Sequence, residues 1–372
     1  MKHQDMVLVT GGAGFIGSHL VDALINKGFR VRVLDNLSRP THDGKIPDWL
    51  NNTAEFIRGD VRIKKDWIKA LSGVGVVFHL ASYMDYHPDF SRYFDTNVKS
   101  TALLYEIVVG KKLPVKKIIV ASSQSVYGEG KYTCPGHGVF YARMRSETQL
   151  KKHEWEVCCP KDGKAAEILP EFETDELSPQ SPYAVSKLAS EKLCQILGQT
   201  YRIPSIALRY SIVLGERQSF RHFYSGALRD FCVRAMAGLE ILTHEDAMQI
   251  RDFVNIHDVT QAHLLVLESK KADYQVLNVG SGRTSRIIDL ANTVCNAAKI
   301  IHKPLATGKF RINSPRNSVM SIGKLKKLGY KPKYDLKDSV FEYLHWIQGY
   351  PEAISYLKKT YAKMHKEGIL KP

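Results

Sequence analysis

Residues 6–17 read Met6-Val-Leu-Val-Thr-Gly-Gly-Ala-Gly-Phe-Ile-Gly17 and join an apolar β-branched run to a glycine-rich turn and an amphipathic segment. This order predicts a buried strand, a tight turn and a helix. The glycines permit the turn, the close approach of a pyrophosphate and close helix-to-strand packing, while the first helical amides face the phosphates. The stretch therefore predicts a dinucleotide site formed by Gly11, Gly14, Phe15, Ile16 and Gly17.

The first half of the chain continues as alternating strand and helix patterns, which is typical of a parallel sheet. Helical spacing of apolar residues covers 16–27 and 94–109. We expect strands at 6–10, 30–35, 55–58, 74–81, 117–122, 205–210 and 276–279. The predicted fold class is α/β, with a Rossmann-type doubly wound parallel sheet.

Past Leu214 the pattern loosens into shorter elements separated by glycine and proline, which indicates a smaller C-terminal α/β substrate lobe. We expect the cofactor domain to span 1–211, with an insertion at about 129–177. The substrate lobe should span 212–372, with about 252–280 returning to the cofactor domain. Ligands of open α/β sheets bind at the carboxyl edge of the strands, so this lobe should set the specificity.

The composition is that of an ordinary globular protein, with 44% hydrophobic and 24% charged residues among 372. Without an apolar run of membrane-spanning length or a signal-peptide pattern, we expect a cytoplasmic enzyme with no membrane partner. Cys194, Cys232 and Cys295 stand alone in apolar surroundings and are expected to be reduced core residues.

The net charge of +15 is concentrated near the C-terminus, because residues 299–372 hold sixteen Lys/Arg and five Asp/Glu, a difference of +11. Such asymmetry can indicate nucleic-acid binding. However, the region lacks interleaved aromatic residues and a helix-turn-helix pattern. We therefore favour a solvated basic face that attracts an anionic nucleotide substrate, with no nucleic-acid partner.

Asp35 ends the second predicted strand, where its carboxylate can accept hydrogen bonds from the adenosine ribose and would repel a 2′-phosphate. This favours NAD over NADP, although Arg39 could neutralise a phosphate and Asp35 could merely stabilise the loop with Asn36. Asp60 could bind the adenine amino group or only stabilise a turn. The remaining cofactor candidates are Lys187 and, by their positions at or just after the strand ends, Asn36, Val61, Leu80, Ala81 and Ser82.

Tyr183 and Lys187 are one helical turn apart in the run from Ser181 to Leu193, so they share a helix face. The tyrosine pKa of roughly 10 must fall before the phenol can act as a base near neutrality. Lys187 and an oxidised nicotinamide ring are the expected positive charges. The same spacing also occurs on ordinary solvated helices, and the upstream glycine turn is what favours catalysis.

A hydroxyl for the reacting centre can come from the segment Ala121-Ser-Ser-Gln-Ser-Val-Tyr-Gly128 after the fifth strand. Ser122, Ser123 and Ser125 all fit the position. Spacing does not choose among them, and each could simply stabilise a turn.

Together with Asp35-Asn-Leu, Ser122-to-Gly128, Tyr183-to-Lys187 and Arg251-Asp-Phe-Val, the glycine turn resembles the extended short-chain dehydrogenase/reductase family. The resemblance covers nearly the whole chain. The most similar members are nucleotide-sugar 4-epimerases of the UDP-glucose/galactose type, with features of the dTDP-L-rhamnose type.

The resemblance implies an NAD-dependent epimerase, active as a homodimer through the helices of Asn97 and Tyr183. It implies Ser123, Tyr183 and Lys187 as catalytic residues and Asn97 near the cofactor. Arg251 and Arg316 would grip the substrate diphosphate, although either could instead form an ion pair. Gln124 and Ser125 replace the acidic pair of related 4,6-dehydratases, which argues against dehydration.

Two departures limit the comparison. Ile212 stands where UDP-galactose 4-epimerases carry a substrate-binding asparagine, so the hexose and the nucleotide base, UDP or dTDP, stay open. The insertion is longer than in common epimerases and contains Cys134-Pro-Gly-His137 and Cys158-Cys-Pro-Lys-Asp162. Cys134, His137, Cys158 and Cys159 could bind zinc, or the segment could be a loop with free thiols over the substrate mouth.

Other functional classes fit the same motifs. A dehydrogenase, reductase or decarboxylase of the family would use the same residues with net turnover of cofactor. A non-enzymatic NAD-sensing or RNA-binding relative is suggested only by the basic C-terminal region. Retention of Tyr183 and Lys187 favours the enzyme.

Overall fold

The computed structural model describes residues 5–85, 88–222, 226–357, 359 and 370–371. Its centre is a seven-stranded sheet in the order β14-β9-β5-β4-β1-β2-β3, and all neighbouring strands run parallel. The prediction of a Rossmann-type doubly wound sheet is confirmed. The strands are β1 (Met6–Thr10), β2 (Arg30–Asp35), β3 (Glu55–Arg58), β4 (Val74–His79), β5 (Lys117–Ser123), β9 (Ser205–Tyr210) and β14 (Val276–Val279).

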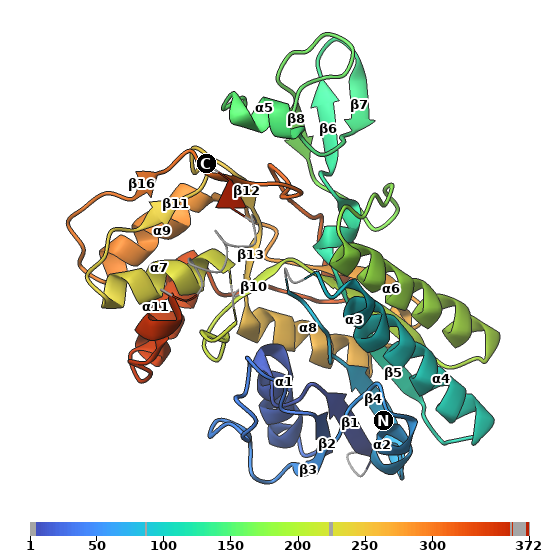
Figure 1. Ribbon diagram of the computed structural model, residues 1–372. Helices are drawn as coiled ribbons and strands as arrows, with labels where there is room; N and C mark the ends of the chain where they lie inside the picture. Colours follow the sequence, from blue (N-terminus) through green and yellow to red (C-terminus); the bar gives the residue numbers. More distant parts are fainter. Residues whose placement is uncertain (1–4, 86–87, 223–225, 358, 360–369, 372) are drawn as a thin grey trace.

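Helices cover both faces of the sheet, which explains why its central strands are apolar along their whole length. On one face, α1 (Phe15–Asn26) and α8 (Ile256–Glu268) pack together over the sheet. On the other face lie α2 (Lys64–Ala70), α4 (Ser100–Gly110) and α6 (Pro182–Thr200) (Figure 1). Trp67, Tyr105 and Cys194 fill the second interface and are fully buried.

The sequence predicts these elements closely, with two differences. β4 ends at His79, two residues before the expected end, because the chain turns at Ala81 to pack against the glycine turn, where the Ala81 N–H donates to Thr10 Oγ1 at 3.2 Å. The helix expected at 94–109 begins as a π-helical segment, η1 (Phe94–Lys99), before α4. The short α3 (Phe90–Tyr93) precedes it.

A smaller lobe lies beside the sheet, as predicted. Its core is formed by α7 (Gly226–Met236), α9 (Ile287–Ala297) and α11 (Leu336–Ile347) (Figure 1). Cys232 and Cys295 lie in this core, and both are free thiols like Cys194, as expected. The remaining short elements are β10 (Ile212–Leu214), β11 (Leu242–Thr243), β12 (Ile250–Arg251), β13 (Phe253–Asn255), η3 (Lys270–Ala272), β15 (Ser285–Arg286), β16 (Leu305–Ala306), β17 (Phe310–Arg311), α10 (Gly323–Lys326) and β18 (Leu370–Lys371).

The expected insertion forms a small unit of its own above the carboxyl edge of the sheet (Figure 1). It follows η2 (Gln124–Tyr127) and holds the antiparallel sheet β7-β6-β8 around Tyr132, Ala142 and Val157. Its elements are β6 (Lys131–Cys134), β7 (Gly138–Tyr141), α5 (Glu147–Lys151) and β8 (Glu167–Leu169).

Among the residues described, no helix combines the length and the apolar character that crossing a bilayer requires. Most of the basic C-terminal region is described, whereas residues 358, 360–369 and 372 lie outside the described residues.

Candidate active site

A cavity of about 330 Å³ lies at the carboxyl edge of the central strands. It collects residues that the sequence predicts for the cofactor from five separate parts of the chain. They are Gly11, Gly14, Phe15, Ile16, Gly17, Asp35, Asn36, Val61, Leu80, Ala81, Ser82 and Lys187. Tyr183 lines the same cavity, whereas Asp60 and Asn97 do not.

The glycine turn is packed so closely that side chains are excluded from it. A Cβ atom on Gly11, whose φ is +68°, would lie 2.9 Å from the backbone of Ala81. A Cβ atom on Gly17 would lie 2.2 Å from the carbonyl oxygen of Gly11. Bare backbone at the N-terminus of α1 therefore forms one wall of the cavity, and such a wall fits a dinucleotide pyrophosphate.

Asp35 lies at the end of β2 with its carboxylate anchored to the backbone. Its oxygens accept hydrogen bonds from Ala13 N–H at 3.1 Å and Leu37 N–H at 2.9 Å. Arg39, which could have neutralised a 2′-phosphate, pairs instead with Asp43 at 3.2 Å and is largely exposed. The negative charge of Asp35 thus stays unopposed by Arg39, which fits NAD better than NADP.

Asp60 and Asn97 lie just behind the cavity. Burial alone would raise the pKa of Asp60, but hydrogen bonds from Arg62 and Asn36 outweigh it and lower the pKa to about 2. The amide of Asn97 bonds Ser82 Oγ at 3.1 Å, the backbone of Tyr83 and Ser186 Oγ at 2.9 Å. Both side chains are therefore placed to hold the cavity walls in position.

Tyr183 and Lys187 come together because α6 starts sharply. The Ser181 hydroxyl caps the helix by accepting from Ala184 N–H at 3.1 Å, and Pro182 occupies the first turn. Tyr183 is then in the first turn, and Lys187 follows one turn later on the same cavity wall.

The electrostatics of this pair differ from the sequence-based expectation. Burial raises the pKa of Tyr183 to about 12, although a hydrogen bond with Ser123 opposes this shift. Burial also lowers the pKa of Lys187 to about 8, although the negative charge of Glu191 opposes that shift. In the protein alone, the loss of solvation outweighs the hydrogen bond with Ser123, so the pKa of the phenol lies above its ordinary value. Lowering this pKa requires a further positive charge beside Tyr183.

The structure distinguishes the three candidate serines. Ser122 donates its hydroxyl to buried Glu191 at 2.7 Å, and Ser125 donates to Ser123 Oγ at 3.0 Å. Ser123 alone of the three shares a hydrogen bond with Tyr183. The geometry thus favours Ser123 as the hydroxyl beside the reacting centre.

Sequence reasoning missed two features around this centre. Glu191 and Arg209 form a buried bidentate ion pair behind Lys187, with N–O distances of 2.6 and 2.9 Å. Tyr210, at the carboxyl end of β9, lines the cavity and bonds His263 Nε2 at 2.7 Å. The available signals were the position of Glu191, one turn after Lys187, and that of Tyr210 at a strand end.

Comparison with known proteins agrees with this arrangement. The model of the NAD dependent epimerase/dehydratase family matches residues 7–148 and 160–280. The chain belongs to this family. It is 30% identical over 349 residues to dTDP-L-rhamnose 4-epimerase of Burkholderia thailandensis, covering 92% of this chain and 94% of that protein.

Solved structures of epimerases share the fold. Thermus thermophilus UDP-glucose 4-epimerase in complex with NAD is 28% identical with a TM-score of 0.73, covering 93% of this chain and 99% of its own. UDP-N-acetylglucosamine 4-epimerase of Methanobrevibacter ruminantium, in complex with UDP-N-acetylmuramic acid, is 27% identical with a TM-score of 0.76, covering 94% and 99%.

In this member of the family, a second cavity of about 160 Å³ lies in the smaller lobe among α7, β11 and β12. Arg251 and Arg311 line it, together with the apolar side chains of Phe231 and Leu242. Arg251 is one of the substrate ligands predicted from the sequence, whereas Arg311 is a further arginine that only the structure places here. The carboxylates of Asp230 and Glu245 also line it, so the cavity presents charges of both signs beside apolar groups.

Arg316, the other predicted diphosphate ligand, does not line this cavity. Its guanidinium is 1% exposed and pairs with Glu156, Glu245 and Asp246 at 2.6, 3.1 and 2.7 Å. Its backbone carbonyl, in turn, accepts a hydrogen bond from Arg251 at 2.8 Å. The structure therefore places Arg316 as a support beneath Arg251.

One strand segment links the two cavities. Ser318 pairs with Arg251 as a β-bridge, and its hydroxyl donates to Gln124 Oε1 at 2.9 Å. Gln124 directly follows Ser123. A ligand held at Arg251 would therefore lie beside a segment that contacts the Ser123 loop.

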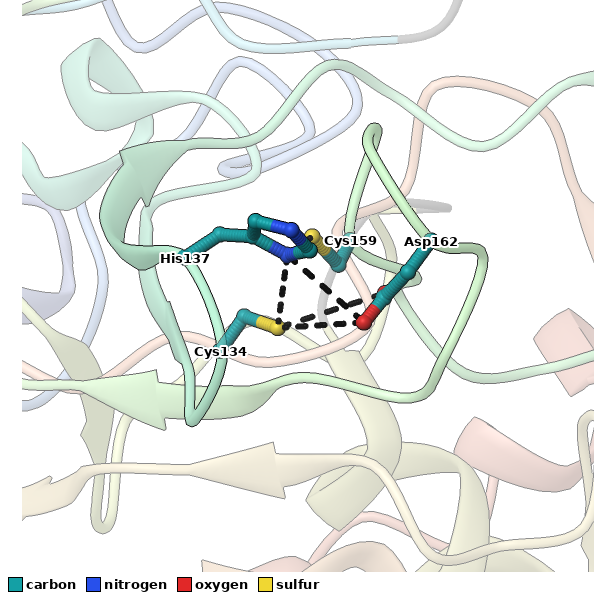
Figure 2. A group of neighbouring side chains, drawn as sticks. All are labelled: Cys134, His137, Cys159 and Asp162. Carbon is teal, nitrogen blue, oxygen red and sulfur yellow. Dashed lines mark hydrogen bonds and ion pairs between the residues drawn. The ribbon is translucent and has the colours of Figure 1, made fainter.

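In the insertion, the structure brings together a group of possible metal ligands that differs from the predicted set in one member. Cys134, His137 and Cys159 lie together with Asp162, whereas Cys158 is exposed and directs its thiol to the carbonyl of Glu156 at 3.7 Å. Adjacent residues of an extended segment face opposite sides, and Cys158 forms a β-bridge with Ala165. Cys158 and Cys159 therefore point apart, and Asp162 takes the fourth position (Figure 2).

Proposed function

We propose that this protein is an NAD-dependent epimerase that inverts C4 of a nucleotide-diphosphate sugar through a transient 4-keto sugar. The observation that carries the proposal is that Tyr183 and Lys187 line the cavity of the glycine turn, while Ser123 shares a hydrogen bond with Tyr183. A base beside a dinucleotide site can remove the proton of a hydroxyl group, while the carbon that carries this hydroxyl gives its hydride to the dinucleotide. The epimerases named above support the choice of reaction.

Each residue then has a defined task. Tyr183 takes the proton of the sugar 4-hydroxyl. It returns this proton after the 4-keto sugar has rotated in the site to present its opposite face. Ser123 holds the C4 oxygen by a hydrogen bond, and Lys187 contributes positive charge beside the phenol. Bound NAD supplies a hydride acceptor and then a hydride donor, so that no net oxidation occurs. Asp35 would hold the adenosine ribose of the dinucleotide, and the glycine turn would hold its pyrophosphate.

The reaction is tested by incubating purified protein with UDP- and dTDP-hexoses in the absence of reductant. We expect the C4 epimer to form with no net change in NADH. Obligatory NADH production or consumption would instead indicate a dehydrogenase, reductase or decarboxylase. A protein that retains NAD but converts no sugar in the panel would favour a non-enzymatic relative.

Replacing Ser123 with alanine should lower kcat roughly 10- to 100-fold, since a hydrogen bond to a charged group contributes about 1.5–3 kcal/mol. Ser125→Ala is the matched control, because Ser125 donates to Ser123 and has no hydrogen bond with Tyr183 in the described contacts. The control should retain most of the activity. Equal losses in the two variants would contradict the assignment of Ser123.

The substrate is expected to be a UDP- or dTDP-hexose bound with its nucleotide near Arg251 and Arg311. Because carboxylates already neutralise Arg316, we assign its contribution to supporting Arg251. Ile212, in β10, replaces the substrate-binding asparagine of UDP-galactose 4-epimerases. The panel should therefore include glucose, galactose and deoxysugars.

A homodimer through α4 and α6 is part of the proposal. Val185 and Ile196 on α6 and Phe90 and Phe94 nearby are large apolar side chains with exposures of 40, 58, 57 and 43%. Ile196→Glu should convert the dimer to a monomer in light scattering. Ile301→Glu is the control, since Ile301 is 95% exposed in the other lobe. A wild-type protein that is monomeric at working concentration would refute the dimer.

A further inference from the structure

Two turns of the insertion bring four possible metal ligands face to face (Figure 2). The first turn is Cys134-Pro-Gly-His137-Gly138, and the second is Cys159-Pro-Lys-Asp162-Gly163. Both therefore have the order Cys-Pro-x-ligand-Gly, and both glycines have positive φ, +76° and +72°. His137 N–H donates to Cys134 O at 3.1 Å, and Gly163 N–H donates to Cys159 O at 2.9 Å. The turns are thus two similar loops, each of which presents a thiol and a second ligand.

The distances between the ligand atoms fit one tetrahedral ion. His137 Nδ1 lies 3.6 Å from Cys134 Sγ, 3.4 Å from Cys159 Sγ and 3.6 Å from Asp162 Oδ2. Asp162 Oδ2 lies 3.8 Å from Cys134 Sγ, and all the ligand atoms lie within 4.8 Å of one another. Zinc bonds of about 2.0–2.3 Å in a tetrahedron place neighbouring ligand atoms roughly 3.3–3.8 Å apart. The four distances given above already fall in this range, and the remaining pairs, which lie within 4.8 Å, would reach it by contracting by at most about 1 Å.

We propose that Cys134, His137, Cys159 and Asp162 bind a structural zinc ion. Two thiolates and an imidazole favour zinc over the hard ions magnesium and calcium. A set of four protein ligands is typical of a closed structural site, because a catalytic zinc keeps a position for water. Lys164 N–H donates to Asp162 Oδ1 at 3.1 Å and orients this carboxylate from behind.

The site lies where a small unit needs a cross-link. The main apolar cluster of the insertion has three buried members, Tyr132, Ala142 and Val157, against which Phe140, Ala166 and Ile168 pack, and this is little apolar area for three short strands. A zinc ion would join the end of β6 to the 159–163 turn, whose preceding segment carries Glu156. Glu156 pairs with Arg316, and Arg145 of the insertion pairs with Glu245 at 2.8 Å. Zinc therefore supports the wall of the smaller-lobe cavity, outside the reacting centre.

The first test is metal analysis of the intact protein purified without chelator. We expect one equivalent of zinc per chain, released when the thiols are modified. Cobalt exchanged into the site should give the visible absorption of tetrahedral thiolate-bound Co²⁺. Substoichiometric zinc in reduced protein, with no uptake from added zinc, would overturn the proposal. A Cys134–Cys159 disulfide found in metal-free protein by mass spectrometry would also overturn it.

Variants then test the ligands. Cys159→Ser should lose zinc, whereas the adjacent Cys158→Ser should keep the full equivalent. Because Cys159→Ser could unfold the insertion, Asp162→Cys provides a second test and should hold the metal more tightly against a competing chelator. Equal zinc loss in the Cys158 and Cys159 variants, or weaker retention by Asp162→Cys, would contradict this ligand set. NAD content should stay unchanged in every variant, which separates this result from the fate of the proposed epimerase activity.

Discussion

Tyr183→Phe should lower kcat for 4-epimerisation by about 10³-fold, since a positioned general base contributes roughly 10²- to 10⁴-fold. The substitution removes only the phenolic oxygen, so it should leave the fold and the cavity intact. KM should change little, because the phenol acts on the proton in transit and contributes little to ground-state binding. The measurement is steady-state conversion of the best sugar of the panel.

The control is the amount of NAD released when the variant is denatured, which should equal that of the wild type. Tyr127→Phe is a matched variant, because Tyr127 is another buried phenol that does not line the cavity; its hydroxyl donates to Asn278 at 2.8 Å and accepts from Arg209 at 2.7 Å. Wild-type turnover by Tyr183→Phe would remove the proposed mechanism, whatever cofactor is bound.

Because burial raises the pKa of Tyr183, its phenol can act as a base only when a further positive charge lies beside it. With a pKa of about 12 in the protein alone, the phenol holds its proton at neutrality. Lys187 cannot correct this by itself, because its own charge is destabilised by burial. The positive charge of an oxidised nicotinamide would favour the phenolate, so base strength would appear only with the oxidised cofactor in place. This coupling suits an enzyme that must not deprotonate its substrate prematurely.

The fold was accessible from sequence because each strand is a short apolar run with a clear end. The seven predicted strands all lie in the observed sheet, and β4 differs only where Ala81 turns toward Gly11. The glycine turn was equally clear, since side chains at Gly11 or Gly17 would collide with backbone. Local steric rules decide such features.

The details of the site were less accessible, because they depend on contacts between distant residues. The choice of Ser123 required knowing that Glu191 binds Ser122, and these residues are 69 positions apart. Arg316 could be marked as cationic, but not as already paired with Glu156, 160 positions away. Asp162 joins the possible metal ligands only because the structure places the 159–163 turn opposite Cys134. Periodicity carries no information about such pairings.

Arg209→Met should destabilise the protein by about 3–5 kcal/mol, because it leaves the Glu191 carboxylate buried without its counter-charge. Glu191 is fully buried, Arg209 is 2% exposed, and the pair forms two hydrogen bonds. The measurement is the midpoint of urea unfolding. Glu268→Gln is the control, since its ion pair with Lys27 is exposed and should contribute less than about 1 kcal/mol. An equally small effect in Arg209→Met would show that the buried pair does not stabilise the fold.

The double variant Glu191→Leu/Arg209→Met should recover much of this loss, because an apolar pair removes the unpaired charge. The double variant should nevertheless keep an altered pH dependence of its activity. Glu191 raises the pKa of Lys187, which burial otherwise lowers to about 8. Without Glu191 that pKa falls further, so Lys187 loses its proton at lower pH and the alkaline decline in activity should shift toward neutrality. A double variant with restored stability and an unshifted pH profile would show that the charge of Lys187 is not required, whereas a shifted profile would connect the buried pair to the chemistry of Tyr183.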